Sequence, residues 1–193
     1  MSAAVLHGLW LLVFTLWTGG EIGLLLRTRE NAQPGRNWDR GTLRLLWLTI
    51  VVAITIGQFL HGFAGPSSAL RSPAVPLAAL ALLVSGVVLR FAAIRTLGRA
   101  FTVNVAIRNH QQVVQHGLYS LVRHPSYSAL VLIIFAVGVQ TANFLALAIT
   151  FLPPLVALLW RIHVEEFALR SVLGQLYADY ARRVRYRLIP GLW

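Results

Sequence analysis

The stretch GLYSLVRHPSY, residues 117–127, is a short polar segment between long hydrophobic blocks, and it holds residues that could do chemistry. Arg123 and His124 stand directly before Pro125, which fixes its own φ and drives the preceding residue toward extended geometry. The segment therefore predicts a rigid bend just before a helix that begins near Ser126. A guanidinium and an imidazole on such a bend could bind a polar ligand, or they could anchor a helix at a membrane surface.

A second polar pair lies further along the chain, where Arg161 and Glu165 are four residues apart on a predicted helix. This spacing places both side chains on one helix face, whereas Glu166 is rotated by about 100° from Glu165. An exposed pair of this kind contributes only about 0.2–0.5 kcal/mol and is common on helix surfaces. This pair, however, follows directly on an apolar segment, so it is also a candidate for a partly desolvated functional site.

Several reaction classes have no motif in this chain. The sequence holds no cysteine, and its six histidines include no H-E-x-x-H spacing, so no metal site is predicted. There is also no G-x-S-x-G elbow and no P-loop. These observations argue against the common hydrolases and nucleotidases.

The composition is that of an integral membrane protein with a single membrane domain. Of 193 residues, 57% are hydrophobic and only 12% are charged. The formal charge of +11 comes from arginine alone, and the arginines are divided among the loops next to the hydrophobic blocks. Such loops attract anionic membrane lipids. No soluble module is available to present a basic face, so nucleic acid is not expected as a partner.

The hydrophobic blocks predict an all-α protein with about five transmembrane helices. Three N-terminal spans are expected at residues 5–26, 43–63 and 73–89, the third continuing as helix to residue 97. Residues 129–160 carry no charge and would measure about 48 Å as one helix, so they predict a helical hairpin of two short arms that turns at residues 141–143. Pro153 and Pro154 are expected to kink its second arm. Short amphipathic helices should follow from Arg161 and over residues 175–184, separated at Gly174.

Two features of the polar segments remain open. Residues 101–108 and 112–115 show the alternation of short extended pieces, which predicts a small hairpin at the membrane surface. Glu21 lies inside the first span, where a carboxylate is a functional candidate by default, but it could also reach the interface or pair with an arginine.

Five spans would place all the arginines except Arg71 on one side of the membrane. Positively charged loops stay in the cytoplasm, so the N-terminus is expected outside and the C-terminus inside. The same count brings residues 123–127 and the pair Arg161 and Glu165 to one membrane face. The candidate active site is therefore predicted to be cytoplasmic.

The combination of R-H-P-x-Y, an uncharged hairpin, an E-E pair and G-x-x-Y-x-x-Y resembles the isoprenylcysteine carboxyl methyltransferase (ICMT) family and its phospholipid-methyltransferase relatives. The likeness covers residues 97–192, within a methyltransferase core expected at residues 90–193 after the three spans of residues 1–89. It implies an S-adenosyl-L-methionine site on the cytoplasmic face, built without a Rossmann domain. The implied cofactor contacts are Arg108, Gln111, Gln112, Val113, Val114, Tyr119, His124, Pro125, Ser126, Tyr127 and Glu165.

By the same resemblance, Arg161 stands where the family has an arginine that faces the substrate, so Arg161 and Glu165 are the expected catalytic residues. Gln111 stands where family members commonly have histidine, and Leu118 replaces the frequent Pro or Val. A sulfonium cation would suit a carboxylate and the faces of Tyr119 and Tyr127.

The resemblance leads to a membrane methyltransferase that O-methylates the carboxylate of a lipophilic, isoprenoid or prenylcysteine-like acceptor. Arg161 could orient that carboxylate through two hydrogen bonds, and a carboxylate needs no general base. The alternatives are a phospholipid N-methyltransferase, a membrane reductase that resembles sterol reductases and uses NADPH, and a non-catalytic membrane scaffold.

Overall fold

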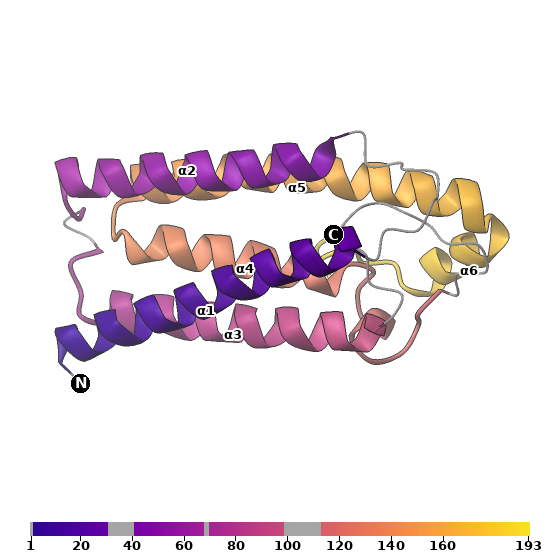
Figure 1. The fold of residues 1–193 in the computed structure, drawn as a ribbon, viewed down its shortest axis with the longest axis horizontal. Helices are drawn as coiled ribbons and strands as arrows, with labels where there is room; N and C mark the ends of the chain where they lie inside the picture. The colour runs from indigo at the N-terminus through magenta and orange to yellow at the C-terminus, as the bar shows by residue number, and fades with distance from the viewer. Residues whose placement is uncertain (1, 31–40, 68–69, 99–112) are drawn as a thin grey trace.

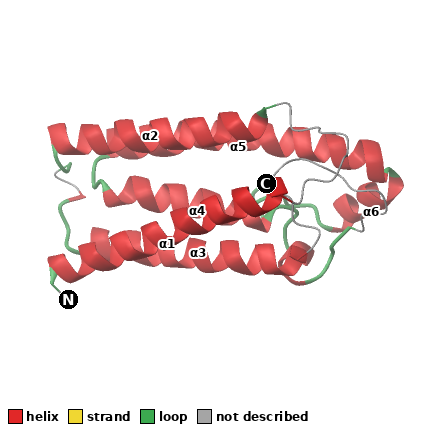
Figure 2. Ribbon diagram, viewed as in Figure 1, coloured by secondary structure: helices red, strands yellow, loops and turns green. Residues whose placement is uncertain are grey.

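The computed structural model describes residues 2–30, 41–67, 70–98 and 113–193, and all regular structure in these ranges is helical (Figure 2). The helices, in chain order, are α1 (Ala3–Glu30), α2 (Thr42–Ala64), α3 (Ala74–Leu97), the 3₁₀ turn η3 (Gly117–Ser120), α4 (Pro125–Gln140), α5 (Phe144–Leu173) and α6 (Gln175–Arg183). The all-α prediction is confirmed for these residues. The extended pieces predicted at 101–108 and at residue 112 lie outside them, and residues 113–115 form no strand.

Successive long helices run in opposite directions along one bundle (Figure 1). Helix α3 packs on α4, α2 packs on α5, α4 packs on α5, and α1 packs on α3. The N-terminus, the α2–α3 connection and the α4–α5 turn lie at one end, and the start of α4 and helix α6 lie toward the other (Figure 1). This alternation brings the bend before α4, the end of α5 and helix α6 to the same end of the bundle (Figure 1).

Four helices are long and apolar enough to cross a membrane: α1 up to Arg27, α2, α3 and α5. Helix α4 is equally apolar but has only 16 residues, which corresponds to about 24 Å at about 1.5 Å per residue. The multi-pass membrane class is therefore supported, while a fifth crossing by α4 stays a prediction.

The predicted helical hairpin is present, and its turn is where the sequence indicated it. Asn143 caps α5, because its side-chain oxygen accepts hydrogen bonds from the backbone N–H groups of Leu145 and Ala146, each 3.0 Å long. The prediction of two short arms was wrong for the second arm. Helix α5 has 30 residues and continues through Pro153 and Pro154 into the segment that was expected to be a separate amphipathic helix.

Small residues bring the helices close enough for the core to pack. A Cβ atom at Gly86 on α3 would lie 2.6 Å from the Ile133 side chain on α4, and one at Gly57 on α2 would lie 2.1 Å from the Thr150 hydroxyl on α5. Packing at these positions requires glycine. The close contact at Gly86 packs α3 against α4, and one turn further along α3 Arg90 reaches Ser126 in the first turn of α4.

Candidate active site

The bend before α4 is held by the C-terminal tail. His124 precedes Pro125 with φ −129° and ψ 57°, and Pro125 is the first residue of the helix. The backbone N–H groups of Arg123 and His124 each donate a 2.9 Å hydrogen bond to a carbonyl of the tail, at Tyr186 and Arg187. The predicted rigid bend is confirmed. The contact of the bend with residues 186–187 could not be predicted from the sequence, because it is made by backbone atoms that every residue has.

The Tyr127 hydroxyl joins the two residues that were predicted to be catalytic. It donates a 2.6 Å hydrogen bond to Glu165 Oε2 and accepts a 2.9 Å hydrogen bond from Arg161 Nε. Arg161 is only 2% exposed, and its Nη1 donates to Thr42 Oγ1 at 3.0 Å. The sequence placed Arg161 and Glu165 on one helix face. The structure adds that a phenol from α4 bridges them and that Thr42, at the start of α2, is a further partner of Arg161.

Glu166, which was given no role from the sequence, is the centre of a buried charge network. Its carboxylate accepts from Arg187 Nε and Nη2, each at 3.1 Å, and lies 3.1 Å from Arg123 Nη1. His124 Nε2 lies 3.3 Å from the same carboxylate, and Arg170 Nη2 lies 3.5 Å away. Glu166 is 4% exposed. One carboxylate thus ties the bend, helix α5 and the C-terminal tail together.

Two side chains implied as cofactor contacts are engaged by the protein in this structure. The His124 imidazole faces Glu166 and stacks on the Tyr127 ring, with centroids 5.6 Å apart and planes inclined by 18°. The Ser126 hydroxyl accepts from Arg90 Nη1, and both residues are buried. These contacts favour a role in shaping the site.

Glu21 is paired with an arginine, which was one of the alternatives left open from the sequence. Its carboxylate receives a two-pronged contact from Arg90 on α3, with Nε–Oε1 at 2.7 Å and Nη2–Oε2 at 2.9 Å. Arg90 Nη1 also donates to the Ser126 carbonyl at 3.1 Å. The first span therefore reaches the bend through a chain of buried hydrogen bonds.

Of the remaining predicted cofactor contacts, three are buried or half-buried and three lie outside the described residues. Tyr119, in η3, is buried, and its carbonyl accepts a 2.8 Å hydrogen bond from the Tyr180 hydroxyl. Burial raises the pKa of the Tyr119 phenol, so the ring stays neutral and acts as an apolar face. Val113 and Val114 are half-buried, and Val113 packs against the cluster around Tyr180. The predicted contacts outside the described residues are Arg108, Gln111 and Gln112.

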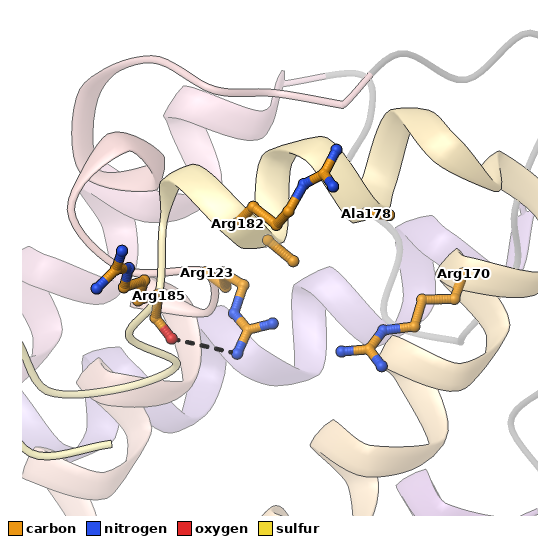
Figure 3. A pocket seen from close by; sticks show the side chains of 6 residues that line it. Arg123, Arg170, Ala178, Arg182 and Arg185 are labelled. Atoms are coloured by element: carbon orange, nitrogen blue, oxygen red, sulfur yellow. Dashed lines mark hydrogen bonds between the residues drawn. The ribbon is translucent and has the colours of Figure 1, made fainter.

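A cavity of about 400 Å³ opens beside the bend, between α6 and the end of α5 (Figure 3). Its lining residues are Arg123, Arg170, Ala178, Ala181, Arg182 and Arg185. Figure 3 shows the Arg123 guanidinium between α6 and Arg170, with its hydrogen bond to the Arg185 carbonyl. Four guanidinium groups repel a cation, so this cavity does not suit a sulfonium.

The surroundings of Glu165 suit a sulfonium better. Glu165 is half-buried, and the neutral ring of Tyr119 lies close enough for the two side chains to interact electrostatically. The nearby positive charges of Arg90 and Arg123 are each paired with a carboxylate, that of Glu21 and that of Glu166. A carboxylate and aromatic faces are the kinds of group that suit the sulfonium of S-adenosyl-L-methionine.

Comparison with known proteins agrees with the family suggested by the motifs. Residues 79–171 match the family model of the isoprenylcysteine carboxyl methyltransferase (ICMT) family. The chain is 38% identical over 114 residues to protein-S-isoprenylcysteine O-methyltransferase B of Arabidopsis thaliana, covering 54% of each chain. It is 35% identical over 112 residues to a probable protein-S-isoprenylcysteine O-methyltransferase of Oryza sativa subsp. indica, covering 54% of this chain and 56% of the relative.

A third relative, protein-S-isoprenylcysteine O-methyltransferase of Tribolium castaneum, is 34% identical over 112 residues and is covered over 38% of its length. The chain thus spans about half or less of the length of these curated relatives. The matched segment includes Arg90, the RHPSY bend, Arg161 and Glu165, and it ends before α6. The resemblance predicted from the sequence is therefore confirmed: residues 79–171 of this chain match the ICMT family.

Proposed function

We propose that this protein is an integral membrane methyltransferase that uses S-adenosyl-L-methionine to convert the carboxylate of a lipophilic, prenylcysteine-like acceptor into a methyl ester. The observation that carries this proposal is the Arg161–Tyr127–Glu165 chain of hydrogen bonds within a segment that matches the ICMT family. It supplies a cation for the acceptor carboxylate and an anion for the methyl donor, held at a fixed separation by one phenol.

Each side chain has a distinct proposed task. When bound, S-adenosyl-L-methionine would supply the methyl group of its sulfonium to a carboxylate oxygen and leave as the neutral thioether S-adenosylhomocysteine, a transfer that needs neither a metal nor a covalent intermediate. Glu165 holds the positive end of the donor. Arg161 holds the acceptor carboxylate, which would exchange with the Thr42 hydroxyl on Nη1 because a charge-assisted hydrogen bond is stronger than a neutral one.

Burial supports this division of tasks. Arg161 is almost fully enclosed, so an ion pair with the acceptor carboxylate would be screened little by water. Glu165 is half-buried and therefore accessible to a second ligand. Tyr127 positions both residues and takes no part in proton transfer, because a carboxylate nucleophile has no proton to lose.

We further propose that the chain crosses the membrane five times, with the N-terminus outside and the active site and C-terminus in the cytoplasm. The alternating helix directions support this arrangement, because they gather the start of α4 and helix α6 at one end of the bundle (Figure 1). The arginine-rich segments of the sequence flank the same helix ends. Prenylated acceptors and membrane lipids would then reach the site from the bilayer.

The test is methyl transfer by the detergent-solubilised protein from S-adenosyl-L-methionine labelled in the methyl group. The acceptors are N-acetyl-S-farnesylcysteine and phosphatidylethanolamine in separate reactions. We expect label in the farnesylated acid that is released as methanol by base, which identifies an ester. Base-stable label in the amine lipid would instead indicate a phospholipid N-methyltransferase. Oxidation of NADPH with a sterol substrate and no methyl transfer would indicate the reductase.

A further inference from the structure

A buried ion pair joins α1 and α3 within the bundle. Glu21 and Arg90 lie within membrane-spanning helices, are 4% and 9% exposed, and make two contacts of 2.7 and 2.9 Å. Transfer of two charges out of water costs several kcal/mol per ion, and a buried pair often stabilises a protein no more than apolar residues of similar size. Its geometric effect is therefore of more interest than its contribution to stability.

The pair does not end at the two helices. Arg90 uses its remaining nitrogen, Nη1, to donate to both the carbonyl and the hydroxyl of Ser126. All three guanidinium nitrogens thus have partners, and the planar group can satisfy them in only one orientation. Ser126 is in the first turn of α4, and the next residue is Tyr127.

We propose that Glu21 and Arg90 are positioning residues for methyl transfer: Glu21 orients Arg90, Arg90 holds the backbone at Ser126, and this places the Tyr127 hydroxyl between Arg161 and Glu165. The inference rests on the proposed function and extends it to the first span. Glu21 lies outside the segment 79–171 that matches the family, so nothing in that match assigns it a role.

Distances explain why such a remote pair matters. The Tyr127 hydroxyl makes contacts of 2.6 and 2.9 Å, and a shift of about 1 Å would break at least one of them. Displacement of a positioned group by about 1 Å can lower a catalytic rate by about 100-fold. Release of Ser126 therefore acts on turnover more than on the affinity for the apolar acceptor, which the bilayer-facing helices would bind.

The experiment compares Glu21→Gln, Glu21→Asp, and the double variant Glu21→Leu with Arg90→Met in the full-length protein in detergent. The double variant removes both charges together, so no buried charge is left unpaired and the fold should keep its thermal stability. The measurements are the melting temperature, the Kd of S-adenosylhomocysteine, and kcat and KM with N-acetyl-S-farnesylcysteine. The control is Thr150→Val, because the Thr150 hydroxyl is buried on the far part of α5 without a hydrogen-bond partner in the described structure.

We expect the double variant to melt within a few degrees of the wild type while kcat falls about 10- to 100-fold and KM changes less than threefold. Glu21→Asp, which keeps the charge, should recover part of the kcat lost in Glu21→Gln, and Thr150→Val should be unchanged. A folded double variant with kcat within twofold of the wild type would show that the pair is merely structural and would overturn the proposal. A wild-type protein that binds S-adenosylhomocysteine but methylates neither acceptor would overturn the proposed function, and this inference with it.

Discussion

Substitution by Gln should affect the neighbouring carboxylates differently: at Glu166 it should mainly lower stability, and at Glu165 it should mainly weaken cofactor binding. Glu165 is half-buried and its hydrogen bond is to the Tyr127 hydroxyl, whereas Glu166 is 4% exposed and lies among three arginines and His124. The substitution of each by Gln removes one negative charge and keeps the side-chain size. Any difference between the two variants therefore reports their surroundings.

The magnitudes follow from the contacts. Removal of one partner from a buried ion pair costs about 3–5 kcal/mol, and because Gln keeps one acceptor oxygen for Arg187, we expect Glu166→Gln to lower the free energy of unfolding by about 3 kcal/mol. In Glu165→Gln the amide oxygen can still accept from Tyr127, so the loss should stay below about 1 kcal/mol. For the binding of S-adenosylhomocysteine, we expect the larger loss in Glu165→Gln instead. Binding should weaken by about 1–3 kcal/mol in Glu165→Gln and less in Glu166→Gln.

The assay combines equilibrium unfolding by SDS in mixed micelles with calorimetric titration of S-adenosylhomocysteine, both on detergent-solubilised protein. Binding is measured under conditions in which circular dichroism shows each variant folded. Equal losses of stability in the two variants would refute the charge network around Glu166. Equal losses of binding, or none in Glu165→Gln, would refute the assignment of Glu165 to the cofactor.

Four further variants and one titration extend these expectations. Tyr127→Phe should lower the free energy of unfolding by about 1–3 kcal/mol, because it removes the hydroxyl that accepts from buried Arg161 and donates to Glu165, and kcat should fall by at least tenfold. Arg161→Lys should recover only part of the ester-forming activity lost in Arg161→Ala, because Lys keeps the charge but not the planar fork. A single cysteine at Trp193 should resist an impermeant thiol reagent added outside intact cells. Burial raises the pKa of Tyr180 to about 12 from 10.0, so its contribution to stability should be complete below pH 10 and lost as the pH rises toward 12, as measured by unfolding at pH 9 and 11.

Each of these expectations has a control and a contrary outcome. Tyr186→Phe changes an exposed phenol for which the described structure shows no hydroxyl hydrogen bond, and a Tyr127→Phe variant no less stable than this control would refute the bridge. Full recovery by Lys at position 161 would show that charge alone suffices. Labelling of the cysteine at Trp193 from outside would exclude the five-span orientation. Tyr180→Phe should reduce the decline above pH 10 without abolishing it, because burial also raises the pKa values of Tyr119 and Tyr177; an unchanged decline would assign it entirely to those other phenols.

Much of the fold could be predicted because its determinants are local. The hydrophobic blocks have the length of membrane helices, and the ends of α2 and α3 lie within a few residues of the predicted boundaries. The hairpin turn was identified because Thr141 and Asn143 interrupt an apolar run, and the Asn143 side chain forms the helix cap. The second arm was misjudged because Pro153 and Pro154 locally oppose a helix, whereas packing of α5 along α2 keeps it continuous.

The composition of the site was also predictable in part. The spacing of Arg161 and Glu165 placed both side chains on one helix face, and the bend at Pro125 was expected from its effect on the preceding residue. The roles of Glu166 and Thr42 were missed, because an acidic residue beside another and a threonine at a helix start are both common and carry no signal about a distant partner. Only the packing of α2 and α4 on α5 brings them to Arg161 and His124.

The sequence by itself determined the membrane class, the helical segments, the position of the α4–α5 turn and the likeness of residues 79–171 to the ICMT family, because hydrophobicity, turn chemistry and motifs are properties of neighbouring residues. The tertiary structure alone decided which charges meet. Glu21 and Arg90 are 69 positions apart, and Thr42 and Arg161 are 119 apart. Such contacts form only where helices pack, and in the low dielectric of a buried site each charge must find a partner there.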